Sequence, residues 1–227
     1  IQDYGGRKRF FSDKEVILKS IKFKNKLLST NLKWNIIEEK SKSKLPKKLV
    51  IKNISINSQT IKKNDVFFAI KGKRLDGNRF VCEALKKKSS LTIVNRFNKN
   101  CSLSKQIKVK NTLSFLTKCS SIFRENINAK IISITGSCGK TTLKEMIGLT
   151  LKTISRTTLS PKSFNNKYGV PLSLFNLKQN DKFGVFEVGM DKKGEIDNLT
   201  KIVKPDLGVI TNISYAHSKN FKNINQI

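Results

Sequence analysis

The stretch from Ile131 to Met146, IISITGSCGKTTLKEM, limits the possible folds more than any other part of the chain. Its first four residues are β-prone and predict a short buried strand. A glycine-containing turn follows, and a helix is predicted to begin at Lys140. A strand, a glycine turn and a helix in this order are typical of a phosphate-binding loop, in which backbone N–H groups and the positive end of the helix dipole face phosphate oxygens.

The spacing inside this turn assigns roles to its residues. It reads Gly-x-x-Gly-Lys-Thr, which is shorter than the common Gly-x-x-x-x-Gly-Lys-Ser/Thr loop, so an ordinary glycine turn is the alternative. In a phosphate-binding loop, Lys140 reaches the β- and γ-phosphates and the Thr141 hydroxyl binds Mg²⁺. The residues expected to bind the nucleotide are Gly136, Ser137, Cys138, Gly139, Lys140, Thr141 and Thr142. The apolar face predicted for the helix that follows is Leu143, Met146, Ile147 and Leu151.

Composition narrows the class of protein. A chain of 227 residues that is 37% hydrophobic and 27% charged is expected to be globular, with one large domain or two small ones. It contains no run of about 20 apolar residues, so no membrane insertion is expected.

The net charge of +30 raises the alternative of a basic P-loop ATPase that binds nucleic acid. Arginine, which makes bidentate hydrogen bonds to bases and phosphates, is sparse. The lysines are spread along the whole chain and form no single basic stripe. Lys, Asn and Ile are all abundant and have AT-rich codons, so genome composition explains the charge at least as well. We therefore expect no nucleic-acid partner.

The cysteines indicate a reducing compartment. Cys82, Cys101, Cys119 and Cys138 form no Cys-x-x-Cys pair and have no clustered histidines, which excludes an ordinary zinc site. We expect reduced thiols and a cytoplasmic protein. Cys119 lies on an apolar helical face and is predicted to be in the core, whereas Cys138 lies in the phosphate loop.

The first half of the chain divides into two parts. Residues 1–47 are lysine-rich and run into the linker-like stretch Lys40–Lys48, KSKSKLPKK, so a solvated N-terminal extension is predicted. Residues 48–110 are predicted to form a small α/β unit. Its elements are strands at Val50–Ile56, Val66–Ile70 and Leu91–Val94 and a helix near Arg79–Lys88.

Residues 111–227 are predicted to form a second α/β unit. Its elements, besides the phosphate loop, are a helix with Leu113, Leu116, Cys119, Phe123 and Ile127 on one face, an irregular loop over Ser160–Leu174, strands at Phe183–Val188 and Leu207–Thr211, and a helix starting at Gly194-Glu195. Alternating strands and helices predict a mostly parallel sheet, with ligands at the carboxyl ends of its strands.

Two side chains follow the ends of predicted strands on the side of the phosphate loop. Glu187 ends one strand and His217, the single histidine, follows the next. Both residues could bind a metal ion. The structural alternatives are a loop salt bridge for Glu187 and a hydrogen-bonded imidazole for His217. If Glu187 and Thr141 share Mg²⁺, the carboxylate should lie about 4–6 Å from the Thr141 hydroxyl.

Four motifs in this order and spacing resemble the Mur ligases, which are ATP-dependent amide-bond-forming enzymes of peptidoglycan precursor synthesis. They are TGSCGKTTLKEM, SFNNKYGVPLSL, EVGMDKKGEIDNL and PDLGVITNISYAH. Upstream, SINSQTIKKNDVFFAIKGKRLDGNRF resembles the family's UDP-binding segment. The resemblance implies an α/β fold, with a small UDP-binding domain at 48–110 and a truncated, mostly parallel-sheet P-loop ATPase domain at 111–227. A folate-polyglutamate-type ligase lacks such a UDP-binding domain, which counts against that alternative.

Within the family, Asn-Asn-x-x-Gly-Val-Pro-Leu favours the member that adds D-alanyl-D-alanine to UDP-N-acetylmuramoyl-tripeptide through an acyl phosphate. Another Mur-type ligase, which adds a single amino acid, is the alternative. The substrates implied are UDP-N-acetylmuramoyl-tripeptide and D-alanyl-D-alanine, and the cofactors are ATP and Mg²⁺. We expect a monomer.

The resemblance also implies roles residue by residue. Lys140, Glu187 and His217 would be catalytic, with Lys140 on the ATP phosphates. Thr141 and Glu187 would hold one Mg²⁺ and His217 a second. The substrate residues implied are Asn165 and Asn166 for the muramoyl peptide, and Ser58, Lys73 and Arg74 for the uridine diphosphate. The chain departs from the family's usual Asp, Arg and His at Asn57, Gln59 and Asn78, respectively.

The N-terminal end resembles a different family member. Residues 1–20 are similar to the closing segment of the tripeptide-forming Mur ligase, which implies the junction of two fused ligases. We expect residues 1–20 to end with a helix and to make few contacts with the body. The family's carbamylated lysine and amine-binding domain would follow His217, so we expect residues 1–227 alone not to ligate.

Overall fold

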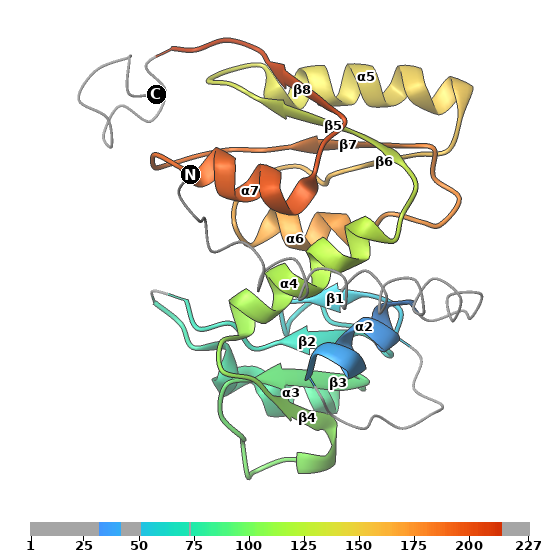
Figure 1. Cartoon of the computed structure of the whole chain (residues 1–227). Helices are drawn as coiled ribbons and strands as arrows, with labels where there is room; N and C mark the ends of the chain where they lie inside the picture. The colour runs from blue at the N-terminus through green and yellow to red at the C-terminus, as the bar shows by residue number, and fades with distance from the viewer. Residues whose placement is uncertain (1–31, 42–50, 73, 215–227) are drawn as a thin grey trace, which may run out of the picture.

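The computed structural model describes residues 32–41, 51–72 and 74–214. Within them the chain forms two parallel sheets of four strands each, which confirms the predicted α/β fold class (Figure 1). The expectations for residues 1–20, Lys73 and His217 lie outside the described residues.

The first sheet has the order β1-β2-β3-β4. Its strands are β1 (Ile54–Ser55), β2 (Val66–Phe68), β3 (Leu91–Val94) and β4 (Gln106–Lys108), and all neighbours pair in parallel. The helical elements between them are η1 (Gly77–Phe80), α3 (Val81–Lys86) and η2 (Leu103–Lys105). The strand predicted at Val50–Ile56 is shorter than expected, and β4 is an additional strand.

The second sheet has the order β6-β7-β5-β8 and is also parallel. Its strands are β5 (Lys130–Thr135), β6 (Thr157–Leu159), β7 (Phe183–Glu187) and β8 (Leu207–Ile210). Helix α5 (Lys140–Ile154) covers one face, and α6 (Gly169–Leu174) and α7 (Glu195–Val203) lie on the other (Figure 1). In the register of the sheet, Ile134 lies opposite Glu187 and Thr135 opposite Ile210, so the carboxyl ends of β5, β7 and β8 meet at one edge.

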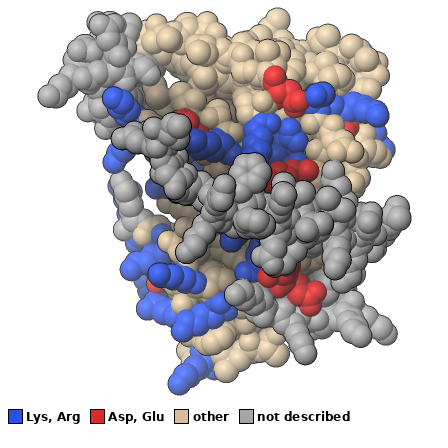
Figure 2. Space-filling model, in the orientation of Figure 1, with Lys and Arg blue, Asp and Glu red and all other residues tan. Residues whose placement is uncertain are grey.

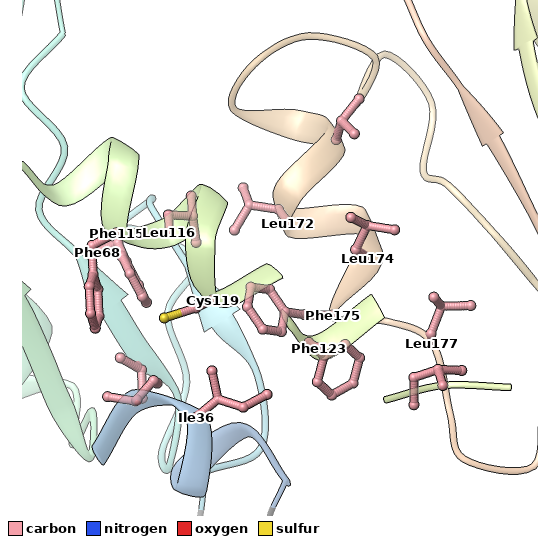
Figure 3. Close-up of a cluster of buried hydrophobic side chains, with 14 of the residues drawn as sticks. Ile36, Phe68, Phe115, Leu116, Cys119, Phe123, Leu172, Leu174, Phe175 and Leu177 are labelled. Atoms are coloured by element: carbon pink, nitrogen blue, oxygen red, sulfur yellow. The ribbon is translucent and has the colours of Figure 1, made fainter. Parts of the chain in front are cut away.

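Helix α4 (Thr112–Glu125) joins the two sheets (Figure 1). Asn111 caps its start by accepting the Ser114 N–H at 2.9 Å. Its predicted apolar face is buried at Leu116, Cys119 and Phe123. Figure 3 shows Leu116 and Cys119 between Phe68 of the first sheet and Phe175 after α6, and Phe123 packs against Phe175, so one hydrophobic core continues through both halves.

Helix α2 (Leu32–Ser41) also enters this core. Ile36 and Ile37 are fully buried, and α2 contacts α4. The prediction of a solvated extension is therefore wrong for residues 32–41. The apolar residues of α2 do not gather on one helical face in the sequence pattern, which therefore does not reveal the docking face.

Two further expectations about local structure are corrected. The end of the predicted irregular loop over Ser160–Leu174 is helix α6, whose residues are all buried. On α5 the inward positions are Lys144 and Gly148, whereas Met146 of the predicted apolar face is 62% exposed.

The cysteine prediction is wrong for one pair. Cys82 and Cys101 form a disulfide between α3 and the loop before η2, with Cα atoms 5.5 Å apart. Cys119 and Cys138 are free thiols, and Cys119 is buried, as predicted; Cys138 is exposed.

Basic side chains lie over both sheets on the face shown in Figure 2, with acidic side chains between them. None of the described helices is long and apolar enough to cross a membrane.

Candidate functional site

The turn after β5 has the conformation of a phosphate-binding loop. Gly136 has φ +131°, and a Cβ there would lie 2.1 Å from the Thr211 hydroxyl oxygen, so only glycine fits. Gly139 has φ +79° and is the N-cap of α5. The first turn of α5 therefore points its free N–H groups into the space beyond β5, where an anion is stabilised by those groups and by the helix dipole.

The Lys140 ammonium lies at the mouth of this loop. It donates to the Gly136 carbonyl at 2.5 Å and to the Ser137 carbonyl at 3.2 Å. The side chain is thus folded over the loop whose phosphate it is expected to bind. The role of Lys140 on the phosphates stays a prediction.

Glu187 ends β7 directly beside the loop. Its carboxylate is nearly buried, with 3% of the residue exposed, and accepts the Thr141 hydroxyl at 2.7 Å. The expected pairing of Glu187 with Thr141 is present, but as a direct hydrogen bond rather than at the predicted 4–6 Å. The Glu187 N–H donates to the Ser160 hydroxyl at 3.0 Å, which fixes the backbone at this strand end.

The two asparagines predicted to face the peptide substrate have different partners. The Asn165 side-chain amide donates to the second oxygen of Glu187 at 2.7 Å. The Asn166 side-chain oxygen accepts the N–H groups of Tyr168 and Gly169, both at 3.0 Å, at the start of α6. Asn165 therefore orients the carboxylate, and Asn166 orders the loop.

A cleft of about 1200 Å³ between the two sheets is lined by part of the predicted site, though not by Thr141 or Glu187. The second half of the chain contributes Gly136, Ser137, Lys140, Asn165 and Asn166 to its wall. The first half contributes Ser58 and Arg74, together with Asn57 and Gln59, at which the chain departs from the family. Phosphate loop and predicted uridine-diphosphate residues thus face one space.

Individual residues of the first half are held firmly. Ser58 is mostly buried and donates to Glu83 at 3.0 Å. The bonds to Ser58 and Lys87 keep the pKa of Glu83 below its ordinary value, with the Lys87 contact the larger cause. Asn78 does not line the cleft; it is buried and donates to Asp76 at 2.6 Å.

Two family models match the chain at the positions of these two halves. The model "Mur ligase family, catalytic domain" matches residues 50–124, and "Mur ligase middle domain" matches residues 134–227. The chain belongs to the Mur ligase family.

Named relatives agree with this assignment. The chain is 36% identical over 174 residues to UDP-N-acetylmuramoyl-tripeptide–D-alanyl-D-alanine ligase of Buchnera aphidicola subsp. Baizongia pistaciae, an alignment that covers 77% of this chain and 38% of that protein. The chain thus spans well under half the length of the relatives it matches.

Solved structures of Mur ligases share the fold. MurF of Acinetobacter baumannii superposes with a TM-score of 0.77 at 32% identity, covering 85% of this chain and 43% of that chain. MurF ligase of Thermotoga maritima in complex with ADP superposes with a TM-score of 0.70 at 32% identity, covering 80% of this chain and 42% of that chain.

Sequence reasoning missed one residue near the site of this Mur ligase chain. Lys144 lies one helical turn after Lys140 and is completely buried. Its ammonium donates to the Ser160 carbonyl at 2.8 Å and pairs with Glu145 at 3.2 Å. Ser160 is also the acceptor for the Glu187 N–H, so Lys144 links α5 to the strand end that carries the carboxylate. The four-residue spacing from Lys140 was the available signal, but a lysine on a helix is usually solvated.

The oxygen atoms beside the loop suit Mg²⁺. Within residues 32–41, 51–72 and 74–214, no three His, Cys, Asp or Glu side chains form a metal-binding cluster. Mg²⁺ bound with a nucleotide needs only one or two protein oxygens besides phosphates and water. The Thr141 hydroxyl and the Glu187 carboxylate, 2.7 Å apart at the phosphate loop, meet that requirement.

Proposed function

We propose that the chain carries the nucleotide-binding loop and the first substrate-binding unit of an ATP-dependent ligase that adds D-alanyl-D-alanine to UDP-N-acetylmuramoyl-tripeptide. The observation that carries this proposal is the shared cleft, which the phosphate loop lines from one side and Ser58 and Arg74 line from the other. The printed names of the relatives, and the ADP of the Thermotoga maritima structure, support the substrate and the nucleotide.

The proposed reaction has two steps. A carboxylate oxygen of the tripeptide attacks the γ-phosphorus of ATP, ADP leaves, and an acyl phosphate forms. The free amine of D-alanyl-D-alanine then attacks the acyl carbon, and inorganic phosphate leaves from the tetrahedral intermediate with loss of the amine proton. In the first step the protein contributes mainly by positioning reactants and stabilising charge on the phosphates.

Different residues of the chain would bind the phosphates and the metal ion. The Lys140 ammonium and the N–H groups at the start of α5 would hold the β- and γ-phosphates. Thr141 and Glu187 would hold Mg²⁺, which supplies charge neutralisation on the phosphate oxygens when bound. Asn165 would keep the Glu187 carboxylate turned toward Thr141. The role of His217 at a second Mg²⁺ rests on the resemblance alone.

Arg74, exposed on the cleft wall, would attract the diphosphate of the UDP moiety, and Ser58 lines the same cleft. Lys73 is proposed for the same diphosphate on the resemblance alone. We further propose a cytoplasmic monomer that does not insert into membranes or act on nucleic acid.

The test is an amine competition in the complete polypeptide that carries this sequence. The enzyme is incubated with Mg·ATP, UDP-N-acetylmuramoyl-tripeptide and one of three amines: D-alanyl-D-alanine, D-alanine or L-lysine. Phosphate release and a new amide product are expected with the dipeptide and not with either single amino acid. Product with a single amino acid would favour the alternative Mur-type ligase, and no product with any amine would refute the proposal.

A further inference from the structure

The segment that follows β8, Thr211–Ser214, runs alongside the phosphate loop and is hydrogen-bonded to it at Thr135, Ser137 and Cys138. The Thr211 N–H donates to Thr135 at 2.9 Å, and its hydroxyl donates to the Cys138 carbonyl at 2.5 Å. The Ser137 hydroxyl donates to the Ser214 carbonyl at 2.9 Å and accepts the Ser214 N–H at 2.8 Å. The loop is therefore held from outside, by a part of the chain more than 70 residues away.

Asn212 makes the contacts at the tip of the turn. Its backbone carbonyl accepts the Ser137 N–H at 3.0 Å, and its side-chain oxygen accepts the Cys138 N–H at 2.9 Å. Of these bonds, the one to Cys138 depends on the side chain. Asn212 also lines the cleft, so this bond lies at the edge of the expected nucleotide site.

These bonds divide the N–H groups of the loop into two sets. The N–H groups of Ser137 and Cys138 donate to Asn212 and already have an acceptor. The N–H groups of Lys140, Thr141 and Thr142 open α5 and have no acceptor within the helix, because the first intrahelical bond is donated by Leu143 to Gly139. The second set is the one available to a phosphate.

We propose that Asn212 is a positioning residue that holds the phosphate loop in its binding conformation before the nucleotide arrives. A turn with glycines at both ends has many alternative conformations, and ordering it costs conformational entropy. If the Asn212 bonds supply that order in advance, the nucleotide binds without having to order the loop itself. The amide oxygen is suited to this task because it accepts an N–H without placing a full negative charge beside a phosphate.

This inference rests on the proposed function only in taking the loop as the nucleotide site, and its test separates the two. Asn212→Ala removes the acceptor of the Cys138 N–H and leaves the backbone acceptor of Ser137. Asn198→Ala, at an exposed position on α7, is the matched control. Three quantities are measured on each protein: the affinity for Mg·ADP, the hydrogen-exchange rate of the Ser137–Cys138 amides, and the melting temperature without nucleotide.

Asn212→Ala is expected to weaken Mg·ADP binding about 3- to 10-fold, the equivalent of one hydrogen bond, and to speed exchange at the Cys138 amide. The melting temperature without nucleotide should stay close to that of Asn198→Ala, because the contact orders a surface turn rather than the core. If wild type binds Mg·ADP and Asn212→Ala binds it with the same affinity, the inference is overturned. An unchanged exchange rate of the Cys138 amide in Asn212→Ala would also overturn it, and this rate can be measured without nucleotide. A wild type that binds no nucleotide would refute the proposed function instead. Asn212→Ser, whose hydroxyl is too short to reach Cys138, is judged by the same outcomes if the alanine variant does not fold.

Discussion

Glu187 shows how single residues make this site. A nearly buried carboxylate is costly unless its oxygens are hydrogen-bonded, and here each oxygen has a donor, Thr141 on one side and Asn165 on the other. The same bonds point the carboxylate at the residue that is expected to share Mg²⁺. The structural and the metal-binding interpretations of Glu187 therefore predict different results for the same substitution.

Glu187→Gln keeps the shape of the side chain and removes its charge. We expect the Mg²⁺ concentration for half-maximal nucleotide binding to rise about 10-fold or more, while the melting temperature falls only slightly, because one side-chain oxygen still accepts a hydrogen bond. Nucleotide affinity titrated against Mg²⁺ measures the first effect. Glu125→Gln, on the exposed side of α4, is the control. A variant that melts far lower but keeps its Mg²⁺ dependence would make Glu187 a structural residue.

The cysteines give a second test at this scale. Burial raises the pKa of the Cys119 thiol to about 12, so this thiol is inert in the folded protein. Without reductant, we expect iodoacetamide to modify only Cys138 in the native protein, Cys119 after unfolding, and Cys82 and Cys101 only after reduction. Mass spectrometry of tryptic peptides distinguishes these cases. Native labelling of Cys82 would contradict the disulfide.

At the scale of elements, the strongly patterned segments were predictable. The strand–glycine–lysine–helix order predicted β5 and α5, and the apolar face with Leu116, Cys119 and Phe123 predicted α4. Strand ends were predictable too, which is why Glu187 could be placed beside the loop. The family resemblance suggested substrate roles for Asn165 and Asn166, which stay predictions, and did not reveal their hydrogen-bond partners.

The elements that sequence reasoning missed have physical reasons in common. Strands β4 and β6 have three residues each, too few for a period to show, and depend on tertiary pairing. On α5, a buried lysine and an exposed methionine invert the usual pattern, because the Lys144 ammonium finds the Ser160 carbonyl inside. The disulfide could not be predicted, because a separation of 19 residues does not reveal that two cysteines come within bonding distance.

The docking of α2 can be tested by truncating a buried side chain. Ile36→Ala should lower the free energy of unfolding by about 2–4 kcal/mol, since it leaves a cavity against α4. Glu39→Ala on the exposed side of the same helix should change it by less than about 0.5 kcal/mol. Urea denaturation gives both values. Equal, small effects would mean that α2 does not dock in solution.

Helix α2 also predicts a pH dependence. Burial lowers the pKa of Lys33 from 10.5 to about 8, and the carboxylate of Asp65 partly opposes this shift. Between pH 8 and 10.5 the unfolded chain therefore binds the proton that the folded protein has lost, so the Lys33 contribution to stability rises with pH in this range. Lys33→Met should be more stable than wild type at pH 7, and the difference should shrink toward pH 10. Urea midpoints at both pH values test this, and a constant difference would refute it.

At the scale of the whole molecule, the site depends on both sheets facing one cleft. Helix α4 and the core shown in Figure 3 join the two halves, and the phosphate loop faces the wall with Ser58 and Arg74 across the cleft. A ligase of the proposed kind must bring a nucleotide and a UDP-linked peptide to one place. This arrangement supplies the two walls.

The most direct test of this account is the affinity of the protein for Mg·ATP, measured by calorimetry for wild type, Lys140→Ala and Lys201→Ala. Lys201 is an exposed lysine on α7 and controls for the loss of one positive charge. We predict saturable binding by wild type and by Lys201→Ala, and binding at least about 10-fold weaker in Lys140→Ala, because the ammonium at the loop mouth contacts the phosphates. Equal affinities for all three proteins, or no binding by a folded wild type, would contradict the assignment of a nucleotide site to this loop.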